Sequence, residues 1–363
     1  MRHKQSDYLH WAKMQSRAPY NLATSGVRSF PLHELPFDFT RMEIHGDNRY
    51  GYGPLQSAIA RHSGVAPECV VEAAGTSMAN HLAMAAILEG GDQVLIEQPV
   101  YGPILDAALY LEADVRRFPR RAENGFAIDP AEVRRSLTAQ TRLIVLTNLH
   151  NPTSVLTPET ILREIGEMAA EAGALVLVDE VYLDAVYDDT PPTAFQLGPQ
   201  FVVTSSLTKV YGVSGLRCGW ILAEPALAWK MRRLNDLYGS LPAHPAELLS
   251  VAAFQNLGLL RDRARRVLDA DRALLSSFLD AHPEMQATRT AFGTTCFARV
   301  PGAQTDAFLA RLRDEQETSA VPGRFFEMPE YIRIGMGVDT EMFREGLRRV
   351  GLALATSGAS AVN

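Results

Sequence analysis

Lys209 stands in a sequence context that suits a nucleophilic lysine better than a surface charge. It lies within the segment 205–212, directly after an apolar run, and Arg217 follows shortly after it. A lysine that is desolvated beside another cation has a lowered pKa, so its neutral amine can attack a carbonyl group. Because a lone lysine is usually a solvated surface residue, this interpretation depends on the residues expected around it.

Four other side chains suit a flat, ring-shaped ligand. Asp179 ends an apolar run and can keep a ring nitrogen protonated, and Tyr182 can present its hydroxyl group to the same ligand. Asn151 can donate a further hydrogen bond, and Tyr101 can stack on the ring. Each also has an ordinary alternative: a capped carboxylate, an Asn-Pro turn or a core aromatic residue.

The turn Gly75-Thr76-Ser77 is a candidate phosphate site because it opens a predicted helix directly after a predicted strand. Free backbone N–H groups and the helix dipole favour an anion there. The alternative is a tight loop in which Thr76 or Ser77 caps the helix. A phosphate site, a ring partner and a Schiff-base lysine together indicate one cofactor, pyridoxal 5'-phosphate.

The elements that must position these residues alternate between apolar strands and amphipathic helices. A helix that Thr157 caps, with Pro158 in its first turn, is predicted to run to Gly173. A second helix is predicted over 78–88. The predicted strands are 70–71, 93–96, 143–147, 174–178 and 201–204. This alternation is typical of a parallel sheet covered on both faces, where ligands bind beyond the carboxyl ends of the strands.

The whole-chain composition excludes several classes of protein. The 363 residues are 47% hydrophobic with a net charge of -7, which argues against nucleic acid or an anionic membrane as the main partner. The three cysteines have no metal-ligand spacing, and no apolar run approaches the roughly 18 residues of a membrane span. The first residues resemble no secretory signal. We therefore expect a cytoplasmic protein without a metal.

In its ordered motifs the chain resembles the class I/II, fold type I aminotransferases from about residue 21 to residue 351. The segments that carry the resemblance are Asn151-Pro152-Thr153, Asp179-Glu180-x-Tyr182, Ser206-x-x-Lys209, Gly215-x-Arg217-x-Gly219, Val321-Pro322-Gly323 and Tyr331-Ile332-Arg333-Ile334. The sequence departs from the family pattern at Ser154, where a glycine is usual, and at His150. Both changes are expected to alter the wall near the substrate.

The resemblance implies an α/β fold with a mainly parallel central sheet, helices on both faces and a smaller α+β domain. The large cofactor-binding domain is expected over 40–255, with 1–39 and 256–363 forming the small domain. The resemblance also implies a homodimer with shared active sites. The tyrosine that reaches the partner's phosphate is Tyr50 by spacing, with Tyr52 as the alternative.

The resemblance also assigns roles to the candidate residues. Lys209 forms the internal aldimine, Asp179 pairs with the pyridinium nitrogen, and Tyr182 and Asn151 contact the ring hydroxyl. The groups that hold the phosphate are Ser206, Arg217 and the turn Gly75-Thr76-Ser77. Arg333 binds the substrate α-carboxylate through its planar fork. Gly26 and Asn151 are also expected at the substrate, and Tyr101 at the cofactor.

The expected reaction moves an amino group between an L-amino acid and a 2-oxo acid. A β-eliminating C–S lyase, a decarboxylase or an amino-acid oxidase would use the same residues, because one fold serves many chemistries. A cofactor-binding regulator would normally carry an added DNA-binding segment. A nicotinamide oxidoreductase is disfavoured because no G-x-G-x-x-G motif follows a strand. The identity of the amino acid stays open.

Overall fold

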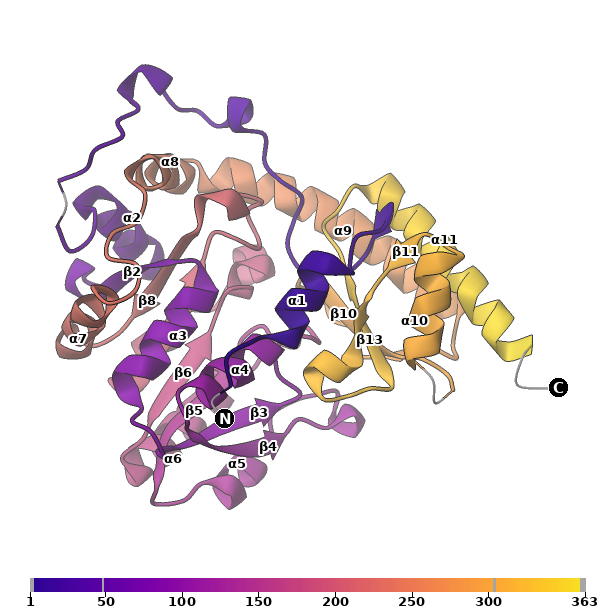
Figure 1. The fold of residues 1–363 in the computed structure, drawn as a ribbon, viewed down its shortest axis with the longest axis horizontal. Helices are drawn as coiled ribbons and strands as arrows, with labels where there is room; N and C mark the ends of the chain where they lie inside the picture. Colours follow the sequence, from indigo (N-terminus) through magenta and orange to yellow (C-terminus); the bar gives the residue numbers. More distant parts are fainter. Residues whose placement is uncertain (1–2, 48, 303–304, 360–363) are drawn as a thin grey trace.

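A seven-stranded sheet forms the centre of the protein in a computed structural model that describes residues 3–47, 49–302 and 305–359 (Figure 1). The strand order is β2-β8-β7-β6-β5-β3-β4. The strands are β2 (Val70–Ala74), β3 (Gln93–Gln98), β4 (Asp114–Pro119), β5 (Thr141–Thr147), β6 (Leu175–Asp179), β7 (Phe201–Ser206) and β8 (Cys218–Leu222). Every neighbouring pair is parallel except the two that involve β8. This arrangement confirms the predicted fold class.

Helices cover both faces of this sheet, so successive residues of each strand enter different cores. Leu177 packs in the core beneath one helix layer, whereas Val176 and Val178 pack in the core of the opposite layer. The first layer contains α3 (Thr76–Ile87), α4 (Gly102–Tyr110) and α7 (Pro225–Asn235). The second contains α2 (Gly53–Ser63), α5 (Pro130–Ser136), α6 (Glu159–Ala172) and α8 (His244–Gln255). The alternation also sends adjacent polar residues at the strand ends to opposite faces.

A smaller antiparallel sheet of order β12-β13-β10-β9 lies beside the large one (Figure 1). Its strands are β9 (Gln286–Ala287), β10 (Thr295–Arg299), β12 (Val321–Pro322) and β13 (Tyr331–Gly335). The accompanying helices are α9 (Leu257–Ala281), α10 (Thr305–Asp314) and α11 (Thr340–Ala359). The chain also has short 3₁₀ helices: η1 (Leu32–Glu34), η2 (Phe39–Arg41), η3 (Pro67–Cys69), η4 (Ala122–Asn124), η5 (Leu183–Asp189), η6 (Ala194–Leu197), η7 (Ser214–Leu216) and η8 (Gly323–Phe326).

The N-terminal segment contributes to the small sheet's side of the molecule. Its strand β1 (Tyr20–Asn21) pairs in parallel with β11 (Thr318–Ser319) from the C-terminal part of the chain. Its first helix, α1 (Asp7–Met14), lies between the two sheets in Figure 1. This pairing agrees with an N-terminal arm that joins the small domain, although the boundaries at 39/40 and 255/256 remain a prediction.

One predicted local feature differs from the structure. Helix α6 begins at Glu159, and Pro158 is its extended N-cap, so Thr157 does not cap the helix. Thr157 is instead engaged by the preceding loop, because its amide donates to Asn148 Oδ1 at 2.9 Å. Strand β8, which pairs with β2 at the sheet edge, was not predicted.

Candidate active site

A cavity of about 470 Å³ opens at the carboxyl ends of β5, β6 and β7, where the sequence predicted a ligand. Many of the predicted residues line it directly: Thr76, Ser77, Tyr101, Asn151, Asp179, Tyr182, Lys209 and Arg217. Leu9 and Lys13 of α1 close the cavity from the N-terminal side. The topology therefore brings residues from six separate segments of the chain to one place.

Lys209 lies in this cavity with its amine held in a defined position. Its Nζ donates a hydrogen bond to Ser25 Oγ at 3.1 Å. Burial, together with the nearby positive charges of Arg333 and Arg217, lowers the pKa of Lys209 to about 8. A substantial fraction of the amine is therefore neutral near physiological pH, as a nucleophilic lysine requires.

Asp179 is a buried carboxylate at the end of β6 with two hydrogen-bond donors. The Val181 amide donates to Oδ1 at 3.0 Å, and Asn80 Nδ2 donates to Oδ2 at 2.8 Å. Burial raises the pKa of Asp179 to about 6, and the bonds from Asn80 and Val181 oppose that rise. The carboxylate is thus ionised at neutral pH. A protonated ring nitrogen beside it would stabilise its buried negative charge.

Beside it, Tyr182 is buried, and burial raises its pKa to about 12. The hydroxyl group therefore stays protonated at neutral pH. It can donate a hydrogen bond to a ring oxygen of a ligand in the cavity.

The predicted phosphate turn has the geometry of an anion site. Gly75 adopts φ +78°, which favours glycine, and a Cβ there would lie 2.2 Å from Arg217 Nη2, so a larger residue would be strained and would displace the guanidinium. Thr76 Oγ1 donates to Ser206 Oγ at 2.7 Å. Arg217 Nη2 donates to the Ala74 carbonyl at 3.1 Å. Backbone amides at the start of α3, two hydroxyl groups and one guanidinium therefore surround a position suited to a phosphate.

Arg333 is fully buried on β13 and reaches the edge of the same site. Its Nη1 donates to Asn151 Oδ1 at 3.0 Å, and its Nη2 donates to Tyr8 Oη at 2.9 Å. The guanidinium lies over the rings of Tyr8 and Phe326, 5.7 and 5.1 Å from their centroids. Its Nε–H has no hydrogen-bond partner within the described part of the chain, which leaves a buried donor available for a carboxylate.

Five predicted site residues are not among those that line the cavity: Gly26, Tyr50, Gly75, Ser206 and Arg333. Gly26 packs against the backbone of Lys209, where a Cβ would lie 3.2 Å from the Lys209 carbonyl oxygen. Tyr50 is exposed, and its hydroxyl donates to Asp236 Oδ2 at 2.9 Å. Tyr52 is less exposed and packs edge-to-face on His244, with 4.9 Å between the ring centroids.

The two departures from the family pattern do not line the cavity. The His150 ring is buried and contacts Thr153 Oγ1 at 2.6 Å and the Pro99 carbonyl at 3.0 Å. Ser154 keeps the backbone of the usual glycine, with φ +61°, and donates to the Thr295 carbonyl at 2.8 Å. Their bonds hold the loop after β5, and the expectation that the two changes alter the wall near the substrate stays a prediction.

Sequence reasoning missed three side chains that contact the predicted set. Tyr8 bonds Arg333, Ser25 accepts from Lys209, and Asn80 donates to Asp179. Tyr8 and Ser25 lie in the N-terminal arm, far along the chain from their partners, and no local pattern marks them. Asn80 has one usable signal, since it is an amide in the first turns of the helix that follows the predicted phosphate turn.

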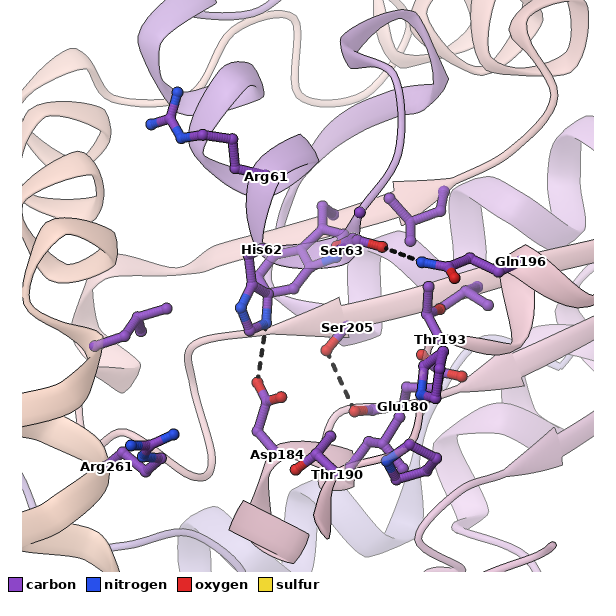
Figure 2. A pocket seen from close by; sticks show the side chains of 18 of the residues that line it. Arg61, His62, Ser63, Glu180, Asp184, Thr190, Thr193, Gln196, Ser205 and Arg261 are labelled. Carbon is purple, nitrogen blue, oxygen red and sulfur yellow. Dashed lines mark hydrogen bonds and ion pairs between the residues drawn. The ribbon is translucent and has the colours of Figure 1, made fainter. Parts of the chain in front are cut away.

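A second cavity, of about 570 Å³, lies on the opposite face of the sheet (Figure 2). Glu180 and Ser205 line it, each next in sequence to a residue at the candidate active site. Asp184 accepts hydrogen bonds there from Tyr211 Oη at 2.8 Å and from His62 at 3.2 Å. This cavity is larger than the candidate active site, but none of the catalytic, cofactor-binding or substrate-binding residues predicted from the sequence lines it.

The described residues contain no group of three or more His, Cys, Asp or Glu side chains placed to hold a metal ion. Within the same ranges, no helix combines the length and apolarity needed to cross a membrane.

Comparison with known proteins identifies the family. The model for aminotransferases of class I and II matches residues 41–350, so the chain belongs to this family and its cofactor is pyridoxal 5'-phosphate. Capreomycidine synthase from Streptomyces vinaceus is 27% identical over 96% of this chain and 93% of its own. Arginine–pyruvate transaminase from Pseudomonas aeruginosa is 28% identical over 81% and 77%. A PLP-dependent aminotransferase from Streptococcus suis superposes with a TM-score of 0.92 at 26% identity, covering 98% of this chain and 99% of that one.

Proposed function

We propose that the protein is an aminotransferase that moves the amino group of an L-amino acid to a 2-oxo acid, with Lys209 as the covalent anchor of the cofactor. One observation carries the proposal: the Lys209 amine and the Asp179 carboxylate line one cavity, and the Arg333 guanidinium lies at its edge through its bond to Asn151. These are the groups needed to attach a carbonyl cofactor, to keep its ring nitrogen protonated and to bind a carboxylate.

The chain's own residues would divide the work as follows. When bound, the cofactor supplies an electron sink for the substrate Cα. Asp179 holds the proton on the ring nitrogen, and Arg333 orients the α-carboxylate through two parallel N–H donors. Once substrate has displaced it, the Lys209 amine carries a proton between the substrate Cα and the cofactor. Tyr182 and Asn151 hydrogen-bond the ring hydroxyl, and α1 covers the cavity from solvent.

The proposal includes a homodimer in which Tyr50 reaches the partner's phosphate. Several large apolar side chains in the segments 44–50 and 229–241 are exposed: Ile44, Trp229, Leu237, Tyr238 and Leu241. The Tyr50 and Trp229 rings are in edge contact, with their centroids 5.1 Å apart. Large exposed apolar groups of this kind mark a surface that another protein covers, and a second copy would cover it while completing the phosphate site.

A second candidate is a synthase reaction on the same cofactor, because the match to capreomycidine synthase spans nearly the whole chain. A β-eliminating lyase, a decarboxylase or an oxidase remains compatible with the same residues. The charges of the cavity lining favour a neutral or acidic amino acid over a cationic one as the substrate. Among the described lining residues Asp179 is the only acid, whereas Lys13 adds a positive charge at the rim.

The test is to record the visible absorbance of the purified protein and then add single amino acids without a 2-oxo acid. Conversion of the cofactor to its amine form, reversed by a 2-oxo acid, supports transamination. Pyruvate and ammonia with an unchanged cofactor would instead indicate β-elimination. If no visible band forms even with added pyridoxal phosphate, Lys209 is not the anchor and the proposal is wrong.

A further inference from the structure

We propose that Asn80 and Thr204 are positioning residues for the cofactor, acting together as a hydrogen-bonded relay that fixes and orients the Asp179 carboxylate. This inference rests on the site proposed above and adds two residues to it. Thr204 Oγ1 donates to Asn80 Oδ1 at 2.5 Å, and Asn80 Nδ2 donates to Asp179 Oδ2 at 2.8 Å. The relay therefore runs from β7 through α3 to the end of β6.

The direction of the relay follows from the chemistry of its members. An amide can be flipped so that either its oxygen or its nitrogen faces a neighbour. The Thr204 hydroxyl lies against the oxygen of Asn80, which leaves the NH₂ group facing Asp179. The ionised Asp179 carboxylate only accepts, so it too selects the NH₂ group of Asn80. Thr204 supplies the donor that the buried oxygen of Asn80 then needs, and so holds the amide in place.

All three side chains are buried, which makes the arrangement rigid. Their exposed fractions are 4% for Asn80, 0% for Thr204 and 4% for Asp179. A buried polar group without a partner costs more than its bond contributes, so each member depends on the others. An apolar residue would satisfy the packing of α3 on the sheet, and an amide there serves no need of the helix itself.

Asn80 donates only to Oδ2 of the Asp179 carboxylate, so the remaining lone pairs of the carboxylate can accept from the cofactor. The Val181 amide holds the other oxygen, Oδ1, at 3.0 Å. The charged groups that act on Asp179 are Lys209 from the loop after β7 and Glu97 from β3, with Glu180 adjacent on the rear face. A hydrogen bond to the charged form favours it, so the Asn80 donor lowers the pKa of Asp179 against the effect of burial.

The neighbouring residue Ser205 provides a matched control. It follows Thr204 on the same strand but faces the second cavity, where its hydroxyl donates to the Glu180 carbonyl at 3.3 Å (Figure 2). A Ser205→Ala variant therefore removes a buried hydroxyl from the same strand without touching the relay.

The experiment compares Asn80→Leu, Thr204→Val, the double variant, Thr204→Ser and Ser205→Ala. The dissociation constant of pyridoxal phosphate is measured from the visible band as a function of pH. We expect Asn80→Leu to weaken binding about tenfold or more, the usual effect of losing a hydrogen bond to a charged group. In this variant the acid limb, the pH range in which cofactor binding weakens as the pH falls, should move to higher pH. The reason is that loss of the Asn80 donor favours the protonated carboxyl of Asp179. Thr204→Ser and Ser205→Ala should bind like the wild type.

The double variant tests whether the two residues act in series. In a relay, Thr204→Val added to Asn80→Leu should cost little more, whereas independent contributions would add. Thermal unfolding of each apo variant separates weak binding from poor folding, and Thr204→Val, a nearly isosteric change, tests the relay if Asn80→Leu fails to fold. Wild-type affinity and an unshifted acid limb in both single variants would overturn the relay alone. A wild-type band that does not depend on Lys209 would overturn the proposed site and the relay with it.

Discussion

At the scale of single residues, Lys209 sets the pH at which the protein can take up its cofactor. Only the neutral amine attacks a carbonyl, and burial with nearby Arg333 and Arg217 lowers the pKa of Lys209 to about 8. The rate at which apo-protein attaches pyridoxal phosphate should therefore rise about tenfold per pH unit below that value and level off above it. Stopped-flow absorbance between pH 6 and 9 measures this rate. A midpoint near that of free lysine would contradict the burial argument.

Arg333 should not be replaceable by lysine. Its fork lies over the rings of Tyr8 and Phe326 and is bonded to Asn151 and Tyr8, a geometry that an ammonium group cannot reproduce. We expect Arg333→Lys to raise the KM for the amino acid at least about tenfold, the effect of losing a charge-assisted bidentate contact. Steady-state kinetics check this. The control is Arg344→Lys on α11, an exposed residue paired with Glu341; an equal change in both variants would contradict the role of Arg333.

The sequence predicted the residues that occur in short local motifs and missed those that only the fold brings close. Lys209 and Arg217 are recognisable because the strand and the turn that position them are adjacent in the chain. Tyr8 and Ser25 act on Arg333 and Lys209 from the N-terminal arm, and nothing near them indicates a partner. The position of Tyr50 in the cofactor site stays a prediction, because in the single chain its hydroxyl bonds Asp236.

At the scale of elements, Ser154 joins the loop after β5 to β10 of the small sheet. Its hydroxyl donates to the Thr295 carbonyl at 2.8 Å, while its backbone keeps φ +61°. Ser154→Ala should lower the free energy of unfolding by about 1–3 kcal/mol, because buried polar groups of Thr295 lose their partner. Ser154→Gly should cost less, by roughly 1 kcal/mol, since it relieves the backbone strain. Urea denaturation at fixed cofactor concentration measures both, and equal stability of all three proteins would refute the argument.

Strand patterns were easier to predict than strand neighbours. Short apolar runs located β3, β5, β6 and β7 to within a few residues, because a fully buried strand needs an unbroken apolar sequence. The order of the sheet depends on contacts between segments far apart in the chain, so the pairing of β2 with β8 could not be derived. The start of α6 was displaced for a similar reason, since Asn148 engages the expected cap.

At the scale of the whole molecule, the apolar surface around Tyr50 predicts the assembly. Leu237 is 78% exposed, so Leu237→Glu should leave the fold of one subunit intact while placing a charge in the proposed interface. We expect a dimer for the wild type and a larger monomer fraction for the variant, with weaker cofactor retention, by light scattering after gel filtration. Leu259→Glu on α9, 45% exposed and outside this surface, is the control. A monomeric wild type that retains cofactor would rule out the shared site.

The edge position of β2 has a consequence for how the protein is made. Ala74 pairs with Cys218, and Gly219 approaches Gly75 so closely that a Cβ on it would lie 2.5 Å from the Gly75 backbone. β2 is synthesised long before β8, so it has no partner strand while most of the sheet is synthesised. The phosphate turn is completed by the same late strand region, through Arg217. The phosphate turn and its guanidinium therefore come together only after β8 has been synthesised and has paired with β2.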